Sequence, residues 1–417
     1  MAKRNRVIYQ SEALFVSKQY SGHVPIDIVN GTHWPGGAGG VPGDRNTLDD
    51  PATIRSGHYH QLHRVQSANY NFSINRQDVN QFGNLARIDT AIIDPPTVGL
   101  DFSYLITDGS NEDKLGITVT ESDNIGCLSG LLADTSGRNF HIVTVAEGED
   151  ANNETAALTD VNTTNKSSKS TSTIISIGNG FVTNYSMNAS VGSIPTASVS
   201  VEGMNITAQP ATTGFPTPSI NPSTATQGTA TCTLPNPVSG TVGQILRPGD
   251  IQVHLSMPGD AAGDRGTGLL ANLADTASKN SAHIQSFNID VPLGRSTINR
   301  LGNVFGFSKE VDFPIQVSVS MSAIVADLKA GNLFDELFQT SSNNMAISMK
   351  KPAGDKKDQI KYILKNASLD SESFSSSIGD NKTVDLSFSA TVGGADDNTN
   401  GVFISGTQID NQEKSAD

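Results

Sequence analysis

The sequence predicts a mainly β fold made of two tandem copies of one β-sandwich or barrel unit, each with at most one short helix. The main observation is an internal repeat: residues 65–108 return as residues 284–327, at a constant offset of 219 residues and without a gap. Eleven of these 44 positions are identical, and many others pair one apolar residue with another. Composition agrees, because Ser, Thr, Asn and Gly are abundant, as is typical of strands and turns.

A second repeated block lies further along each copy. Residues 190–201 echo residues 377–388 at an offset of 187. The first copy therefore carries 32 more residues between its two blocks, and we assign them to a polar insertion at about 147–173.

The repeat also sets the expected domain organisation. The predicted units are residues 1–207 and residues 208–417. The second unit begins with a Pro-, Thr-, Ser- and Gly-rich segment at about 208–243, which is either a linker between the copies or an extended arm.

Composition excludes several classes of protein. The formal net charge is −14 and the pI is about 4.9, which argues against a protein that grips phosphate backbones. Two cysteines do not make a disulfide framework, so a reducing site of assembly is expected. The first residues lack the apolar core of a signal peptide, and no run of 18 apolar residues predicts a membrane span.

The chain opens with a predicted strand at 7–17 and a Gly/Pro-rich loop at 30–50. The loop lacks the Lys of a phosphate-binding loop, so we interpret it as a structural arm or surface loop. His58, His60 and His63 follow, and a strand would place the first two on one face and the third on the other. No carboxylate or cysteine completes a ligand set, so strand-edge or interface histidines are favoured over a metal site.

Polar and apolar residues then alternate over 66–74 and over 98–106, which predicts two half-buried strands. Copy one continues with the polar run 108–113, which resembles a calcium loop only in composition, because it lacks a glycine and a bidentate glutamate at the steps that such a loop requires. The corresponding part of copy two, 333–338, has Leu and Phe at helical spacing, so a short amphipathic helix is expected there. Further strands are predicted at 115–120, 140–145, within 173–205, at 245–257, 359–364, 374–378 and 384–392.

The repeated positions are typical of a scaffold rather than of catalysis. The sequence has no nucleophile elbow, no paired metal-ligand spacing and no phosphate-binding loop, so we expect no enzyme activity, no cofactor and no metal site. Arg76 and Arg295 are the one repeated basic pair, which we interpret as a structural ion pair or an inter-subunit contact. The duplicated structural positions are Arg76, Gly83, Asn84, Pro95, Gly192, Arg295, Gly302, Asn303, Pro314 and Gly379.

The segments VIYQSEALFVS, RPGDI, HIQSFNIDVPLGRSTINRLGN and FVTNYSMNASVGSIPTASVSVEGMN resemble the major tail proteins, or tail tube proteins, of long-tailed bacteriophages. The resemblance is spread over most of the chain and rests on sequence patterns of strands and turns rather than on a fixed signature motif. It implies a tail-tube-like β-sandwich or barrel with one short helix, stacked in rings around a lumen. The usual tube subunit has one such domain and forms hexameric rings. This chain resembles the duplicated form, in which three chains make a pseudo-sixfold ring.

The resemblance also implies the partners and the place of action. The chain is expected in the virion tail, assembled in the host cytoplasm, with other copies of itself, the tape measure protein and a sheath as neighbours. Genomic DNA would pass through the lumen without specific binding, and no membrane is involved. In such a tube the segment 208–243 is either an arm between rings or a linker within the chain. Copy two differs from the repeated sequence at Glu372 and Lys382, where copy one has Tyr185 and Pro195. The outer contacts of the two copies are therefore expected to differ.

A tube that conducts DNA needs a wall that does not hold phosphates, because each neutralising Lys or Arg would add salt-sensitive affinity. We therefore expect a net negative lumen, with basic residues directed outward or into subunit contacts. The alternatives are another virion component, such as a tail adaptor, a capsid decoration or a fibre-like adhesin, and a carbohydrate-binding or hydrolytic β protein.

Overall fold

The structure is a computed structural model of the whole chain. The residues it describes are 12–18, 53–54, 59–120, 125–133, 137–145, 151, 173–210, 215–221, 226–227, 231–232, 245–246, 251–256, 284–302, 305–306, 308–324, 343–350, 358–375 and 383–407. The predicted loop at 30–50, the helix expected at 333–338, His58, Asn303 and Gly379 lie outside these residues, as does nearly all of the insertion at 147–173.

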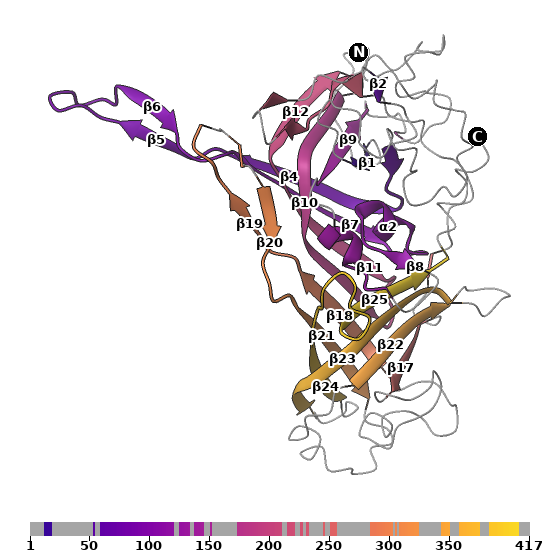
Figure 1. Cartoon of the computed structure of the whole chain (residues 1–417). Helices are drawn as coiled ribbons and strands as arrows, with labels where there is room; N and C mark the ends of the chain where they lie inside the picture. Colours follow the sequence, from indigo (N-terminus) through magenta and orange to yellow (C-terminus); the bar gives the residue numbers. More distant parts are fainter. Residues whose placement is uncertain are drawn as a thin grey trace, which may run out of the picture.

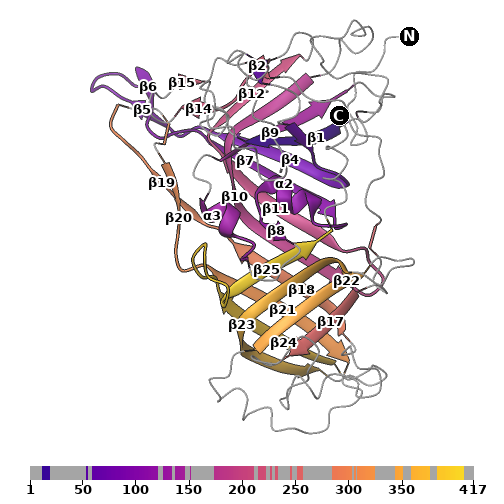
Figure 2. The ribbon, with the colours of Figure 1, turned by 45° about the vertical axis from the view of Figure 1, so that its right-hand side comes forward.

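Copy one forms a sheet in the strand order β1, β9, β10, β11, β7, β4, with β12 added against the first half of β10 (Figure 2). Apolar residues alternate along these strands, so one face is buried: in β7 the residues Val98, Leu100, Phe102 and Tyr104 are all in the core. The strand bounds are β1 Glu12–Lys18, β4 Val65–Ser73, β7 Thr97–Leu105, β9 Arg138–Thr144, β10 Thr173–Ser190, β11 Thr196–Gly203 and β12 Asn205–Pro210.

Copy two repeats this arrangement strand for strand. Its order is β17, β22, β23, β24, β21, β18, with β25 added against the first half of β23. The bounds are β17 Ile251–Ser256, β18 Ile284–Pro292, β21 Gln316–Ile324, β22 Asn343–Lys350, β23 Asp358–Ser375, β24 Thr383–Thr391 and β25 Gly401–Gly406. Strands β18 and β21 begin and end 219 residues after β4 and β7, so the sequence repeat is a repeat of structure. The mainly β class with two tandem copies is confirmed.

The irregularities of the strands are repeated as well. The long strand of each copy carries an asparagine with a left-handed backbone, Asn179 with φ 52° and Asn366 with φ 58°. In both, the backbone N–H donates to an asparagine side chain of the neighbouring strand, Asn139 at 3.2 Å and Asn344 at 3.1 Å. Here the long strand leaves the pairing with β9 or β22 and enters the pairing with β11 or β24. Each copy is thus two sheets that share one bent strand.

The two copies join edge to edge. The second half of β10 pairs antiparallel with β18, from Asn184 opposite Pro292 to Ser190 opposite Ser286. This pairing creates one continuous sheet in the order β4, β7, β11, β10, β18, β21, β24, β23, of which β23 contributes its second half. We refer to it as the common sheet. One end of the common sheet is β4 and the other is β23, and neither has a further strand partner on its outer side among the described residues.

Each copy also extends a two-stranded hairpin, which we refer to as its arm. The arm of copy one, β5 Arg76–Val79 with β6 Asp89–Ile92, projects far from the body (Figure 1). The arm of copy two, β19 Arg295–Ile298 with β20 Ser308–Val311, lies along copy one. The remaining short strands are β2 Thr53–Ile54, β3 Tyr59–Gln61, β8 Val119–Thr120, β13 Phe215–Pro216, β14 Ile220–Asn221, β15 Thr226–Gln227 and β16 Thr231–Cys232.

The helices correct the sequence-based expectation. Helix α2 covers Ser110–Leu115 and α3 covers Ser129–Ala133, so the described residues of copy one include two short helices where at most one was expected. Helix α2 begins inside the run predicted to be a polar loop, and it takes the first residue of the strand predicted at 115–120. Tertiary contacts explain the difference, because Ser110, Asn111, Glu112 and Lys114 are buried and act as polar groups of the core rather than as loop residues.

Candidate functional site

The exposed side of the common sheet is a polar surface, which we refer to as the polar face. Along every strand its residues alternate with the core residues, and they are mainly Ser and Asn. Its charged side chains are Asp101, Glu202, Asp290, Asp370 and Asp385, and the described strand residues of this face include no Lys or Arg. A hollow of about 380 Å³ lies on this face over β10, β18, β21, β24 and β23.

Side-chain hydrogen bonds tie the polar face together across strands. Ser67 and Ser103 share a hydrogen bond of 2.7 Å between their hydroxyls, and the Ser200 hydroxyl donates to Asp101 at 2.7 Å. At the junction of the copies, the Asn184 amide donates to the carboxylate of Asp290 at 3.2 Å. Neutral donors therefore hold Asp101 and Asp290, whereas Glu202 is paired with Lys309 of the copy-two arm.

On the buried side of the same junction lies a cluster of three tyrosines around one carboxylate. Glu112 Oε1 accepts hydrogen bonds from the hydroxyls of Tyr104 at 2.8 Å and Tyr185 at 3.1 Å. The Tyr362 hydroxyl, from copy two, lies 2.9 Å from the Tyr185 hydroxyl and donates to it, since the Tyr185 proton is directed at Glu112. Burial raises the pKa of Glu112, opposed by these hydrogen bonds, and burial raises the pKa values of the three tyrosines well above their usual range.

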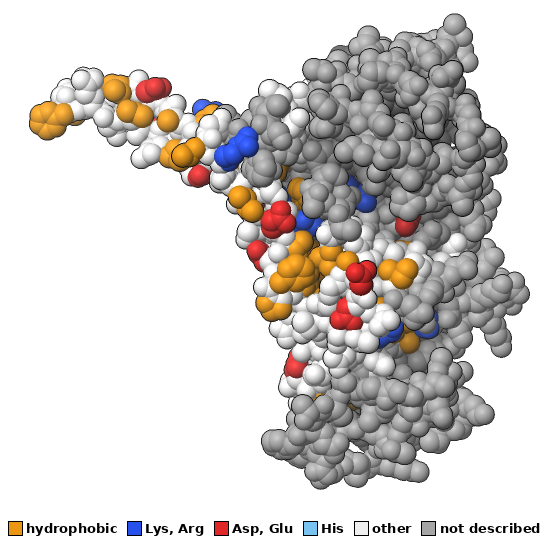
Figure 3. Space-filling model, viewed as in Figure 1, with side chains coloured by type: hydrophobic (Ala, Val, Ile, Leu, Met, Phe, Trp, Pro, Cys, Tyr) orange, Lys and Arg blue, Asp and Glu red, His pale blue; other side chains and the backbone are white. Residues whose placement is uncertain are grey.

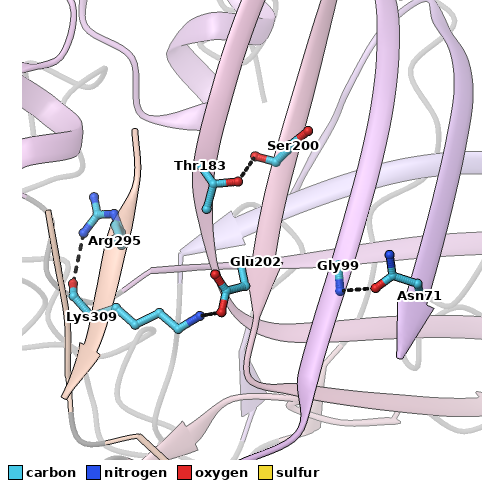
Figure 4. A network of polar contacts seen from close by, with 7 residues as sticks. All are labelled: Asn71, Gly99, Thr183, Ser200, Glu202, Arg295 and Lys309. Carbon is cyan, nitrogen blue, oxygen red and sulfur yellow. Dashed lines mark hydrogen bonds and ion pairs between the residues drawn. The ribbon is translucent and has the colours of Figure 1, made fainter. Parts of the chain in front are cut away.

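The arm of copy two forms hydrogen bonds and an ion pair with residues of copy one (Figure 4). Lys309 Nζ lies 2.6 Å from Glu202 Oε1, and Arg295 donates to the backbone carbonyl of Lys309 at 3.2 Å. The Arg295 guanidinium also donates to the carbonyl of Leu131 at 3.0 Å and lies 4.6 Å from the ring centroid of Phe181, both in copy one. Burial lowers the pKa of Lys309, and the Glu202 carboxylate opposes this shift. The repeated basic residue of copy two is thus a contact between copies.

The β4 edge of the common sheet exposes side chains that its counterpart in copy two buries. Tyr70 and Phe72 are 48% and 47% exposed, whereas Ile289 and Val291, at the same positions of β18, are 0% and 2% exposed. The difference arises because β10 covers β18, while no described strand covers the outer side of β4. The β4 edge therefore presents both unpaired backbone groups and an apolar patch.

The arms end in apolar side chains that are fully exposed in the part of the chain that the structure describes. Phe82 and Leu85 of copy one and Leu301 of copy two are fully exposed, and Figure 3 shows apolar side chains along the copy-one arm and at its tip. Gly83 and Gly302, at the two tips, have φ of 98° and 90°, a conformation that favours glycine. Both arm tips thus present exposed apolar side chains to solvent.

The other duplicated positions that the structure describes lie in turns, in the arms and in the segments that follow the arms. Gly192, with φ 85°, forms the turn between β10 and β11; Arg76 opens β5 and is exposed; Asn84 donates its backbone N–H to the Gln81 carbonyl at the arm tip. Pro95 and Pro314 stand between each arm and the strand that follows it. In the part of the chain that the structure describes, no three His, Cys, Asp or Glu side chains are grouped as a metal would need, and no helix is long and apolar enough to span a membrane.

Sequence reasoning missed most of these contact residues. Glu112, Tyr185 and Tyr362 come from segments far apart in the chain, and the junction pairing that gathers them has no local signature. One signal was available: where the copies differ in kind at one strand position, as at Tyr70 and Ile289 or at Tyr185 and Glu372, the two copies have different surroundings.

Comparison with known proteins gives weak likenesses. No protein-family model and no curated protein matches the chain. Among solved structures, a chain from the sheath–tube complex of the extracellular contractile injection system PVC is matched over its full length (100%) by 41% of this chain, at 12% identity and a TM-score of 0.28. An Hcp protein is matched over 96% of its length by 36% of this chain, at 8% identity and a TM-score of 0.22. A type six secretion system protein follows at 15% identity and a TM-score of 0.23, with 89% of it and 36% of this chain covered. Likeness at this level does not determine a function.

Proposed function

We propose that this chain is a structural protein that closes into rings and stacks them into a phage tail tube, the conduit for DNA ejection. The two units, residues 1–207 and 208–417, each provide one position of the ring, so that three chains make a pseudo-sixfold ring. The proposal joins the sequence resemblance to the geometry of the common sheet. Other copies of the chain, the tape measure protein and a sheath are the partners it implies.

The observation that carries the proposal is the junction inside the chain. Strand β10 of copy one pairs with β18 of copy two, and the free ends of the common sheet are the equivalents of these two strands. The second half of β23 corresponds to the second half of β10, and β4 corresponds to β18. The two free edges of each chain, β23 and β4, therefore correspond to the two strands that pair at the internal junction. If β23 of one chain pairs with β4 of the next, repetition of this head-to-tail contact closes a ring.

The internal junction also predicts the register between chains. Asn184 lies opposite Pro292, and Tyr185 lies opposite Val291. Shifting these positions by the two repeat offsets places Ser371 of one chain opposite Ser73 of the next, and Glu372 opposite Phe72. The apolar patch of β4 would then be buried as its counterpart in β18 is.

Disulfide trapping tests this register. Directly paired strand residues have Cα atoms about 4.5–5.5 Å apart, which a disulfide spans, whereas diagonal neighbours at about 7–8 Å lie outside its range. A chain with Ser371→Cys and Ser73→Cys should form covalent dimers and trimers on mild oxidation, and no larger product. The diagonal pair Ser373→Cys with Ser73→Cys is the matched control, and the wild-type chain reports on its native cysteines. Absence of cross-linked chains would contradict the junction, and a ladder reaching six chains would contradict the three-chain ring.

The polar face is the surface we assign to the lumen. Asp101, Asp290 and Asp385 repel phosphates, the Ser and Asn side chains keep water between DNA and wall, and Lys309 and Arg295 are used in contacts between copies. Negative-stain microscopy separates this function from the alternatives: stacked rings with an open centre support a tube, whereas single particles or fibres would favour another virion component.

A further inference from the structure

A half-buried carboxylate on the free β23 edge has one oxygen that is buried without a hydrogen-bond partner among the described residues. Glu372 Oε1 is out of contact with solvent and accepts no hydrogen bond in the described part of the chain. Burial raises the pKa of Glu372, as expected for a carboxyl group without a donor. Buried polar atoms are nearly always hydrogen-bonded, so an orphan of this kind indicates a donor that arrives from outside the chain.

At the other edge lies a phenol that has no hydrogen-bond partner among the described residues. Tyr70 on β4 is 48% exposed, and its side chain faces the core side of the common sheet, since Tyr70 pairs with the buried Leu100. Copy two has Ile289 at this position, buried against copy one. The hydroxyl group is thus present on β4, the edge that would meet another chain, and absent from β18, the edge that pairs with β10 within the chain.

The register of the internal junction brings these two groups together. Tyr185 lies opposite Val291, and the next position on the same face of β18 is Ile289. Their counterparts between chains are Glu372, Phe72 and Tyr70. Tyr70 is therefore the diagonal neighbour of Glu372 on the buried side of the junction, a separation that long and aromatic side chains bridge.

We propose that Tyr70 of one chain donates a hydrogen bond to the Glu372 carboxylate of the next chain and so locks the junction between chains. The inference rests on the proposed ring and deepens it by naming the residues that determine the contact. The partner is a second copy of this chain, presented through its β4 edge.

The pair differs in its arrangement from the cluster inside the chain. At the internal junction the long strand supplies the phenol, Tyr185, and helix α2 supplies the acid, Glu112. At the junction between chains the long strand supplies the acid and the partner's β4 supplies the phenol. Ile175, the counterpart of Tyr362, has no polar group to offer. The two junctions are consequently not interchangeable, which disfavours pairing of edges in the wrong combination.

A double-mutant cycle on assembly of the full chain tests the pair. Tyr70→Phe keeps the aromatic ring and removes only the hydroxyl donor, which leaves the buried Glu372 oxygen unpaired at the junction. The concentration at which half the chains assemble should therefore rise about tenfold or more. Glu372→Leu should raise it as well. The Tyr70→Phe/Glu372→Leu double variant removes both polar groups and should assemble within a few-fold of wild type.

The matched control is Tyr362→Phe, which removes a phenol hydroxyl from the internal junction. It should lower the stability of the isolated chain and leave the assembly concentration unchanged. Assembly of Tyr70→Phe at the wild-type concentration, or strictly additive effects in the double variant, would overturn the pair while the ring stands. A wild-type chain that forms no rings at all would overturn the ring and the pair together.

Discussion

The β4 edge offers a quantitative test of ring closure through Phe72. In the isolated chain Phe72 is 47% exposed, whereas Val291, its counterpart at the internal junction, is 2% exposed. An aromatic side chain buries about 200 Å², so closure of the ring removes about 90 Å² of Phe72 from water. At about 25 cal/mol per Å² this burial contributes about 2 kcal/mol to each junction, which corresponds to about a 30-fold change in affinity.

The perturbation is Phe72→Ser, and the assay is sedimentation velocity over a series of concentrations. Because a three-chain ring has three such junctions, we expect the variant to need at least about 30-fold more protein than wild type to reach half assembly. Urea unfolding of the dissociated chain, followed by circular dichroism, measures how much stability the chain itself loses, because about half of this side chain is already buried within it.

Ile125→Ser is the matched control, because Ile125 is similarly exposed at 45% and belongs to neither edge. It should cost the isolated chain a comparable free energy and leave the assembly concentration close to that of wild type. The reasoning is refuted if Phe72→Ser assembles at the wild-type concentration, or if both variants shift assembly equally, since the shift would then reflect loss of folding rather than loss of the edge.

Two further predictions concern the folded chain. Burial raises the pKa of Glu112, so the contribution of this group to stability is complete below its unfolded-state pKa of about 4.5 and is lost as pH rises through its folded-state pKa. The Glu112→Gln variant should therefore gain stability relative to wild type as pH rises. Unfolding free energies of the two proteins that change in parallel from pH 4 to 8 would contradict this prediction. The insertion of copy one should be dispensable, because Thr144 and Thr173 are directly paired and a short turn can join their strands; with residues 152–172 replaced by a short Gly-Ser linker, differential scanning calorimetry should still show one cooperative transition, and its loss would count against the insertion being peripheral.

Much of the fold could be predicted because it is local. Alternation of polar and apolar residues predicted β4 and β7, and the gapless offset predicted that β18 and β21 would repeat them, as they do to the residue. The expected strand at 7–17 is represented by β1, within the described residues. These signals need only neighbouring residues, because the side-chain period of a strand is a property of the backbone. The domain boundary at 207 and 208 remains part of the proposal.

Helix α2 could not be predicted in this way. Its sequence, SNEDKL, has the composition of a loop, and its polar residues are buried because partners from other segments satisfy them. Asn111 bonds the backbone of His63, and Lys114 donates to the carbonyl of Gln61. Local propensity is a weak guide where tertiary contacts supply the hydrogen bonds.

The sequence by itself determined that the chain contains two copies of one β unit and that it is acidic. It also determined that copy two has Glu372 where copy one has Tyr185. Only the tertiary structure decided what these facts mean. It paired β10 with β18 and left β4 and β23 as the free ends of one sheet, and it brought together Tyr185 and Tyr362, which lie 177 residues apart in the chain. The reason is physical: the period of a strand fixes which face a side chain takes, but which edges meet depends on long-range pairing that no local pattern encodes.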